Sequence, residues 1–460
     1  MVESRSPQSP DRVIVQVPDA DAGTVADAAR RARQAGREWD RAGGPARAQA
    51  LAAAAERIGA AADELTRLMV DEVGKPVTEA RGEVARGVSI LRYYAQQALE
   101  PDGETLPTAN PKSLLYVRRL PHGVTGLITP WNFPLAIPLW KAAPALAFGN
   151  AVLLKPAPES TAMALRLGEL LGGALPDGLV HVLPGDAEAG RAVVEESDAV
   201  SFTGSVEAGG AVSVAAARRG IPVQAEMGGL NASIVLPDAD LESAAGSVAG
   251  AAMGYAGQKC TATGRVVVVG DDHRLSEASE ALVDAVRGQR IGDPADDDTA
   301  VGPLIAEDAR DKVVAAAGSA RGQGARVLVG GGPVDRAGWY AEPTVVADVP
   351  DGGQLLTEEV FGPIVALRSA GDLSQAVRLN NAVRYGLVTS VYTRDLDMAL
   401  AALGELDTGH VRVNAPTSGV DFWAPFGGEK ASSYGPREQG KAARDFYTTT
   451  HTLTVGPAAR

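Results

Sequence analysis

Cysteine is nearly absent from the 460-residue sequence, in which Cys260 is the only one. A single cysteine excludes an intramolecular disulfide and cannot supply a cluster of thiolate ligands for zinc. We therefore expect no structural disulfide and no metal site, and the surroundings of Cys260 become the first place to look for chemistry.

Basic residues are also scarce relative to acidic ones. The 43 lysines and arginines against 57 aspartates and glutamates give a formal net charge of −14. Such a surface repels phosphate backbones and anionic membranes. We expect neither a nucleic-acid partner nor a membrane partner.

Long apolar runs are missing as well. The most apolar stretch, around residues 135–148, is interrupted by Pro138, Lys141 and Pro144, and residues 1–12 lack the apolar segment of a secretory signal. These absences predict a cytoplasmic protein. The 45% of hydrophobic residues suffice for two or three packed domains.

Local patterns predict where helices and strands begin. Residues 1–18 are polar and contain proline, so we expect them to be extended or loosely attached. Apolar residues at helical spacing follow over residues 21–97 and predict two or three long helices. Residues 106–120 are typical of a strand or hairpin, and the Thr-rich segment 446–455 is typical of an edge strand that joins a neighbouring subunit.

From residue 123 onwards, short apolar strands alternate with helices, which predicts a parallel sheet covered on both faces. Sheets of this kind bind nucleotides at the carboxyl ends of their strands. The strands expected in the first stretch are 123–129, 150–157, 178–185, 199–205 and 222–229. Those expected in a second stretch are 265–269, 325–331 and 364–369.

The neighbours of Cys260 favour a reactive thiol. A free cysteine is most often a small buried apolar residue. Here Gly257 and Gln258 leave backbone amides accessible, and Lys259 supplies positive charge. Both features favour a thiolate nucleophile.

Two further polar residues follow predicted strands. Glu226 is followed by Gly228 and Gly229, which leave space for a water beside the carboxylate, although a solvated turn fits the same pattern. Asn132 lies in the segment ITPWNFP, and its side-chain amide is a suitable donor to an oxyanion.

Several segments are candidates for binding a nucleotide. The turn FTGSVEAGG, residues 202–210, opens a helix whose first N–H groups favour an anion. Lys155 ends a strand where a ribose or an adenine would lie, whereas Glu359 and Phe361 lie in a turn that is usually plain surface.

Taken in order, these segments resemble the aldehyde dehydrogenase superfamily over nearly the whole chain, from about residue 21 to residue 455. The segments that carry the resemblance are PWNFP (130–134), LLKPA (153–157), FTGS (202–205), EMGG (226–229), GQKC (257–260), EEVFGP (358–363) and PFGG (425–428). Seven motifs in register, with the sole cysteine at the nucleophile position, make the resemblance specific.

The resemblance implies a role for each matching residue. Cys260 matches the nucleophile, Glu226 the base that activates the deacylating water, and Asn132 the amide of the oxyanion hole. The implied cofactor contacts are Trp131 and Ser205 near the pyrophosphate, Lys155 at the adenosine ribose, Glu359 at the nicotinamide ribose with Phe361 nearby, and Thr129 and Gly204.

The resemblance also implies the fold. We expect an α/β protein with a Rossmann-like parallel-sheet cofactor domain, an α/β catalytic domain and a small β oligomerisation element, assembled as a homodimer or homotetramer. The expected boundaries are 1–102 and 121–225 for the cofactor domain, 226–413 for the catalytic domain, 103–120 and 438–460 for the oligomerisation element, and 414–437 for a return segment to the cofactor domain.

Three departures from the family pattern stand out. Pro158 replaces the Glu that binds ribose in many NAD-using members, and Glu159 is displaced by one position, so the cofactor is NAD or NADP with NAD slightly favoured. Leu230 stands where a Lys is common. The chain also begins almost at the first helices, without most of the usual N-terminal strand segment.

The substrate expected from the resemblance is an aldehyde such as 2-oxoglutarate semialdehyde. Lys259, and also Lys141, would face its anionic tail. The predicted substrate pocket consists of Phe133, Ile137, Trp140, Lys259 and Phe426, with Phe422 and Trp423 as further aromatic candidates. These aromatic and aliphatic residues fit a neutral aromatic or aliphatic aldehyde equally well.

The predicted activity is therefore NAD(P)-dependent oxidation of a small semialdehyde to its acid, through a thiohemiacetal and a thioester on Cys260. Two alternatives stay open. A thiol acceptor in place of water would make the protein a CoA-acylating dehydrogenase, although Glu226 favours hydrolysis. A protein that has kept the fold and lost turnover would only bind a nucleotide.

Overall fold

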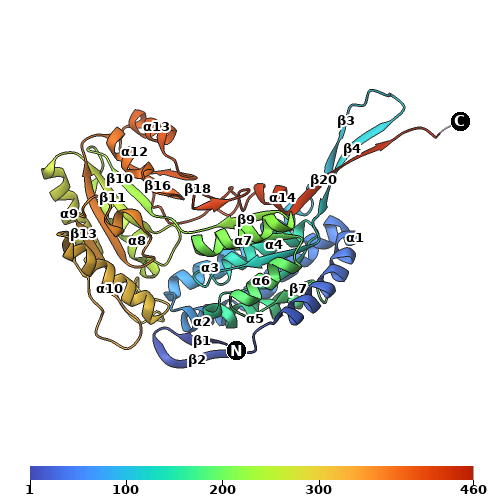
Figure 1. The fold of residues 1–460 in the computed structure, drawn as a ribbon, viewed down its shortest axis with the longest axis horizontal. Coiled ribbons are helices and arrows are strands. Elements are labelled where there is room, and N and C mark those ends of the chain that lie inside the picture. The colour runs from blue at the N-terminus through green and yellow to red at the C-terminus, as the bar shows by residue number, and fades with distance from the viewer. Residues whose placement is uncertain (459–460) are drawn as a thin grey trace.

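Two largely parallel sheets form the centre of the protein, whose computed structural model describes residues 1–458 (Figure 1). The strand order is β19-β9-β8-β5-β6-β7 in the first sheet and β12-β13-β14-β11-β10-β16-β17 in the second. Neighbouring strands are parallel except for the pairs β19–β9 and β12–β13. The predicted α/β class is confirmed.

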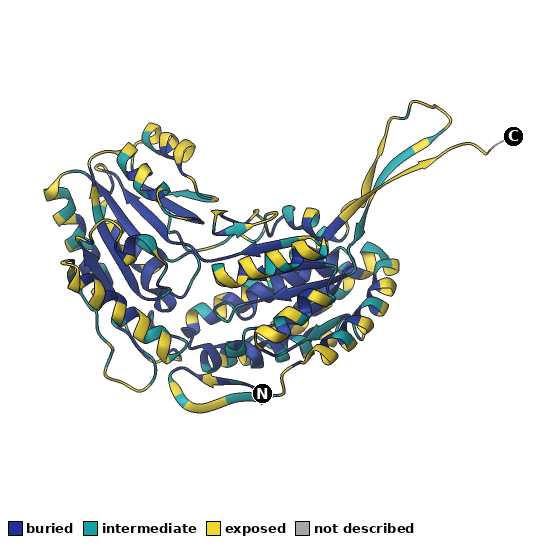
Figure 2. Cartoon of the chain, in the orientation of Figure 1, coloured by how far each residue is buried: buried dark blue, intermediate teal, exposed yellow. Residues whose placement is uncertain are grey.

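The first sheet is surrounded by the helices of the N-terminal half. Its strands are β5 (Val124–Ile128), β6 (Ala151–Lys155), β7 (Val180–Val182), β8 (Ala199–Thr203), β9 (Val223–Glu226) and β19 (Ser433–Tyr434). Its helices are α1 (Ala22–Ala60), α2 (Ala62–Val73), α3 (Val77–Gln97), α4 (Ala136–Ala147), α5 (Thr161–Gly172), α6 (Ala187–Glu196) and α7 (Val206–Arg219). Every residue of β5, β6 and β8 is buried, which Figure 2 shows as a dark core, as expected for a sheet covered on both faces.

The second sheet belongs to the C-terminal half. Its strands are β10 (Asn231–Val235), β11 (Thr263–Val269), β12 (Arg326–Val329), β13 (Thr344–Ala347), β14 (Ile364–Ala370), β16 (Val388–Tyr392) and β17 (His410–Val413). The helices of this half are α8 (Leu241–Met253), α9 (Asp272–Arg287), α10 (Glu307–Gly322), α11 (Gln354–Thr357), α12 (Leu373–Asn381) and α13 (Leu396–Glu405). The strands β10, β13, β16 and β17 escaped the sequence analysis because each has only four or five residues and no marked turn signal.

The order of strands creates a switch point in the first sheet. The chain runs from β5 through β6 to β7 on one side, and then returns to place β8 and β9 on the other side of β5. The loops after β5 and β8 therefore diverge at one edge and leave a crevice between them, which is where open α/β sheets bind ligands. The segments after β5 and β8 are those that hold Asn132 and Ser205.

The N-terminal residues form a hairpin, so the expected extended conformation is confirmed and the alternative of a loosely attached segment is wrong. β1 (Val2–Ser6) pairs with β2 (Ser9–Val17), and Val2, Ser4 and Ser6 are buried. Glu72 of α2 fixes the hairpin, because its carboxylate accepts hydrogen bonds from the Ser4 hydroxyl (2.7 Å) and from two N–H groups at the start of α5. These contacts are long-range and leave no local signal in the sequence.

A three-stranded antiparallel sheet projects from the body of the protein (Figure 1). It contains β3 (Gly103–Leu106), β4 (Leu114–Pro121) and β20 (Thr448–Val455), in the order β20-β4-β3. The predicted strands in 106–120 and 446–455 are confirmed, except that Phe446 and Tyr447 end α14 (Ala442–Tyr447). All residues of β20 after its first are exposed, and so are Leu106 and Leu114.

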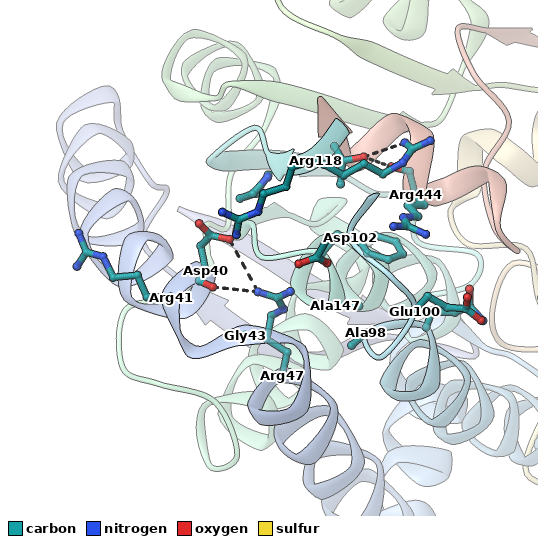
Figure 3. A pocket seen from close by; sticks show the side chains of 15 residues that line it. Asp40, Arg41, Gly43, Arg47, Ala98, Glu100, Asp102, Arg118, Ala147 and Arg444 are labelled. Carbon is teal, nitrogen blue, oxygen red and sulfur yellow. Dashed lines mark hydrogen bonds and ion pairs between the residues drawn. The ribbon is translucent and has the colours of Figure 1, made fainter. Parts of the chain in front are cut away.

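Several arginines lie at the root of this projecting sheet, some of which Figure 3 labels. Arg119 of β4 donates to the Thr448 hydroxyl at 3.2 Å and pairs with Asp445 at 2.8 Å. Nearby, the buried Arg47 of α1 donates to the Asp40 carbonyl at 3.2 Å. These residues line a cavity of about 250 Å³ between α1 and the base of β4, so polar contacts define the direction in which the sheet projects.

No helix within residues 1–458 is both long enough and apolar enough to span a membrane.

Replacing Glu72 with Gln should weaken the attachment of the N-terminal hairpin. Gln keeps one oxygen acceptor and places an NH₂ group where the other oxygen was, so at least one N–H group at the start of α5 faces a donor and loses its partner. We expect the free energy of unfolding to fall by about 1–3 kcal/mol. Chemical denaturation would measure this loss, and proteolysis within residues 7–17 should become faster. The control is Glu64→Gln on the same helix, whose partly exposed ion pair with Arg166 is expected to contribute at most about 1 kcal/mol. Equal stability of Glu72→Gln and wild type would contradict the role given to Glu72.

Candidate active site

A cavity of about 350 Å³ opens at the switch point and reaches the only cysteine. Residues from both halves of the chain line it. Those predicted from the sequence are Trp131, Asn132, Ile137, Gly204, Ser205, Cys260, Glu359 and Phe361. The structure thus brings together eight of the fifteen predicted site residues around one cavity, although they are distributed over 231 positions (131–361) of the chain.

Cys260 is partly exposed and lies at the end of a strained turn. The preceding residues Tyr255 and Ala256 both have positive φ, at 55° and 51°. On the other side, Cys260 packs against a small apolar cluster that contains Leu387, Val388 and Phe426. The sulfur therefore lies between the cavity and an apolar wall.

The expected thiolate is not what this environment favours. Burial raises the pKa of Cys260 to about 12, and the carboxylates of Glu359, Glu226 and Glu438 add to the rise. Lys259 does not offset them, because its ammonium pairs with Glu79 at 2.8 Å. This environment therefore favours the thiol form of Cys260.

Asn132 is tied directly to the loop that holds Cys260. Its Nδ2 donates to the Gln258 carbonyl at 2.9 Å. The Gln258 side chain in turn donates to the Pro303 carbonyl at 3.2 Å and accepts from the Ile305 N–H at 2.9 Å. A primary amide has two N–H hydrogens, so one remains for another acceptor in the cavity.

Glu226 ends β9 beside the short strand β19. The Ser433 hydroxyl donates to its Oε2, whereas its Oε1 is buried without a hydrogen-bond partner among the described residues. Burial raises the pKa of Glu226 well above its usual value, and Glu438 adds to this, while Ser433, Lys141 and Arg437 oppose it. A carboxylate with a raised pKa is suited to accept a proton near neutral pH.

Glu359 approaches the backbone so closely that any side chain at position 228 would displace its carboxylate. The Gly229 N–H donates to Glu359 Oε1 at 3.2 Å. A Cβ placed on Gly228 would lie 1.9 Å from Glu359 Oε2. Burial is the main reason why the pKa of Glu359 rises to about 7. Phe361 has φ of 60°, and its ring meets the Trp131 ring edge to face at 5.8 Å.

The polar groups at the switch point fit a nucleotide cofactor. Thr129 Oγ1 and Thr203 Oγ1, at the ends of the adjacent strands β5 and β8, are buried and have no hydrogen-bond partner within residues 1–458. Ser205 caps α7 by accepting from the Ala208 N–H, so the start of this helix lies at the cavity and favours an anionic group.

Thr129 and Lys155 lie outside the cavity but on the same edge of the sheet. The Thr129 N–H donates to the Lys155 carbonyl at 3.1 Å. Burial lowers the pKa of Lys155, against the opposing influence of Glu159 and Asp186. The carboxylate of Glu159, one position beyond Pro158, is therefore near the Lys155 ammonium.

Two predictions about the substrate pocket are wrong. Lys259 faces Glu79 of α3 and does not line the cavity, and Lys141 is buried in an ion pair with Glu438 and also donates to Ser201. Both lysines are neutralised by carboxylates that are distant in sequence, so neither is free for an anionic tail.

The apolar part of the predicted pocket is distributed around the cysteine. Ile137 lines the cavity, while Trp140 and Phe426 pack together, with ring centroids 6.1 Å apart. Phe133 is partly exposed and presents one ring face to the Lys75 ammonium at 3.8 Å. Phe422 packs against Tyr93 and the exposed Trp423.

Several residues of the site escaped the sequence analysis. Met227, Lys312, Arg384 and Tyr385 line the cavity, and Glu438 faces Glu226 from the C-terminal segment. The only signal for Glu438 was weak: it is the one acidic residue in the segment GPREQG, residues 435–440. The other four have no distinguishing neighbours.

The fold and the cavity together define a nucleotide-dependent oxidoreductase. The chain belongs to the aldehyde dehydrogenase family, whose family model, described as "Aldehyde dehydrogenase family", matches residues 1–453.

Curated relatives cover nearly the full chain. An α-ketoglutaric semialdehyde dehydrogenase from Bacillus subtilis is 36% identical over 99% of this chain and 95% of its own length. A 2,5-dioxopentanoate dehydrogenase from Saccharolobus solfataricus is 35% identical over 98% of this chain and 95% of its own.

Solved structures agree with this assignment. A betaine aldehyde dehydrogenase from Staphylococcus aureus in complex with NAD⁺ is 30% identical, with a TM-score of 0.94 over 100% of this chain and 92% of that one. An NADP-dependent enzyme from Escherichia coli is 33% identical, with a TM-score of 0.94 over 99% of this chain and 95% of its own. The predictions of the family, of an enzyme and of NAD or NADP as cofactor are confirmed. One of the two structures contains NAD⁺ and the other is an NADP-dependent enzyme, so they do not distinguish between the two nucleotides.

Because Cys260 is the only thiol, alkylation reports on it alone. With a pKa of about 12, the thiolate fraction rises about tenfold per pH unit across the neutral and alkaline range. We expect the rate of iodoacetamide labelling of the ligand-free protein to rise about tenfold for each pH unit between pH 7 and pH 10, without a plateau. Glu359→Gln should label faster at each pH, because one of the carboxylates that raise the pKa is removed. A plateau below pH 8 would contradict this.

Proposed function

We propose that this protein oxidises an aldehyde to the carboxylic acid, with Cys260 as the nucleophile. The observation that carries the proposal is that Cys260 and Asn132 line the same cavity as Glu359, at the switch point of the first sheet. The Cys260 thiol loses its proton to a base, for which Glu226 is the candidate, and the resulting thiolate attacks the carbonyl carbon of the aldehyde to form the thiohemiacetal anion.

Asn132 stabilises the negative charge that develops on the substrate oxygen. One hydrogen of its Nδ2 binds the Gln258 carbonyl, which fixes the plane of the amide. The second hydrogen is free for the oxyanion, and a donor that is already oriented needs no reorganisation during the reaction.

The cofactor site combines Trp131, Gly204, Ser205, Glu359 and Phe361, with Thr129 and Lys155 further along the same edge of the sheet. When bound there, NAD or NADP supplies the acceptor for the hydride that leaves the thiohemiacetal. The choice between the two nucleotides, with NAD slightly favoured, stays a prediction.

Glu226 completes the reaction as a general base. Its free Oε1 and raised pKa suit it to take a proton from the water that hydrolyses the thioester on Cys260. The product is then the free acid. A thiol acceptor such as CoA would need no such base, so hydrolysis is the better supported outcome.

The proposed substrate is a small semialdehyde with an anionic tail. It is supported by the relatives from Bacillus subtilis and Saccharolobus solfataricus, which are an α-ketoglutaric semialdehyde dehydrogenase and a 2,5-dioxopentanoate dehydrogenase. Lys259 and Lys141 give no such support, because both are paired with carboxylates.

The proposed assembly is a homodimer or a homotetramer. Support comes from the projecting sheet, in which β20 is an open edge and exposes Leu453 and Val455. An exposed edge strand with apolar side chains is a ready site for pairing with a second copy of the chain. The domain boundaries given above and the cytoplasmic location also stay predictions.

Asn132→Ala should reduce kcat by about 10²–10³-fold, because removal of one oxyanion donor typically costs that much. Steady-state kinetics with a saturating nucleotide would measure the loss. Circular dichroism and nucleotide binding serve as controls for the fold. A wild-type kcat would refute the assignment of Asn132.

A panel of aldehydes tests the substrate. The panel pairs aldehydes that bear a terminal carboxylate with neutral aliphatic and aromatic aldehydes of equal length, each assayed with NAD⁺ and with NADP⁺. We expect the highest kcat/KM for a carboxylate-bearing semialdehyde and a free acid as the product. Neutral aldehydes that are turned over much faster than every semialdehyde would contradict the anionic tail. Formation of acyl-CoA in place of free acid would contradict the hydrolytic step.

A further inference from the structure

A fully buried ion pair lies directly behind Asn132. Lys75 follows the αL residue Gly74 that ends α2, and it pairs with Glu83 in the second turn of α3. The two side chains are 0% and 1% exposed. Burial lowers the pKa of Lys75, and the adjacent Glu83 carboxylate opposes this. Two charges in such a place are costly to desolvate, and they persist only if further hydrogen bonds satisfy them.

Those further hydrogen bonds all go to one segment, the loop between β5 and α4. The Lys75 ammonium donates to the Asn132 carbonyl at 2.7 Å. Glu83 Oε1 accepts from the N–H groups of Leu135 at 3.0 Å and Ala136 at 2.9 Å. The first N–H groups of a helix have no partner within the helix, and no side chain of the loop itself caps α4. Glu83 therefore serves as the N-terminal cap of α4 from a different helix.

The same ammonium also faces the turn that leads to Cys260. It lies 3.8 Å from the centre of the Phe133 ring and 4.6 Å from that of Tyr255, within the range of cation–π attraction. Tyr255 is one of the two strained residues of that turn, and its hydroxyl donates to the Val73 carbonyl, two residues before Lys75. Lys75 thus contacts both the loop that holds the amide and the turn that holds the thiol.

Asn132 is consequently fixed at both ends. Its side chain is bonded to the Gln258 carbonyl, and its main-chain carbonyl is bonded to Lys75. If the second bond were lost, the free hydrogen of Nδ2 would no longer be held in one direction. A displacement of about 1 Å in a catalytic group can cost about 100-fold in rate.

We propose that Lys75 and Glu83 are positioning residues that orient the Asn132 amide toward the substrate oxygen. They touch neither substrate nor cofactor and act through Asn132. This inference rests on the proposed function, in which Asn132 is the oxyanion donor.

The test removes both charges at once. Lys75→Met/Glu83→Gln leaves no unpaired charge in the interior and keeps an oxygen that can accept from the start of α4, so the fold should survive. We expect kcat to fall by about 10- to 100-fold. KM for the aldehyde and the Kd of the nucleotide should change by no more than about twofold, because the binding residues stay in place. The matched control is Arg81→Met/Asp297→Asn, which removes an exposed ion pair between Arg81 of α3 and Asp297 of the loop after α9 and should leave all three parameters unchanged.

A double-mutant cycle separates positioning from a general loss of structure. In an Asn132→Ala background, the same Lys75→Met/Glu83→Gln change should lower kcat by less than about threefold, because no amide remains to be oriented. An equal fall in both backgrounds, or no fall in either, would overturn the proposal.

A second variant guards against misfolding. Glu83→Asp keeps both charges but withdraws the carboxylate from the start of α4, and its effect on kcat should likewise vanish in the Asn132→Ala background. A persistent effect there would overturn the proposal even if the double variant did not fold. Failure of the proposed function is distinguishable, because Asn132→Ala alone would then have a wild-type kcat.

Discussion

One hydrogen bond, from Asn132 Nδ2 to the Gln258 carbonyl, joins the loops of the two sheets at the point where the reaction would occur. Asn132 follows a strand of the first sheet, and Gln258 precedes Cys260 in the second half of the chain. The thiol and the amide therefore keep their relative positions only while the two halves keep theirs. Two further buried hydrogen bonds, from Gln258 to Pro303 and from Lys75 to Asn132, hold the same two loops in place. They give the loops a single arrangement.

Electrostatics around the thiol are dominated by acids. Glu226, Glu359 and Glu438 each raise the pKa of Cys260, and the nearby lysines are occupied by carboxylate partners. These acids disfavour the thiolate form of Cys260. Because the thiolate is the species that reacts with oxidants and electrophiles, the same acids lower the reactivity of this sulfur.

Local patterns were enough to predict the first sheet apart from its edge strand β19, because β5, β6 and β8 are mostly apolar and are followed by glycine or proline turns. The same patterns predicted the cavity, since parallel strands deliver their carboxyl ends to one edge. The sequence did not reveal which charged residues form ion pairs with each other. It indicated no role for Lys75, and it suggested solvent or substrate as the partner of Lys141 and Lys259. In the structure each of the three pairs with a carboxylate, at a distance along the chain of 8 positions for Lys75, 297 for Lys141 and 180 for Lys259. A single sequence contains no sign of such pairings, just as it contains no sign that Glu72 would hold the N-terminal hairpin in place.

The close approach of Glu359 to the main chain at position 228 links two sites that are more than a hundred residues apart. Any side chain introduced at 228 would collide with the carboxylate, and a shorter acid at 359 would lose the N–H of Gly229. A side chain at 228 is accommodated only if the Glu359 carboxylate moves away from the Gly229 N–H. Positions 228 and 359 therefore constrain each other, and a change at one is best combined with a change at the other.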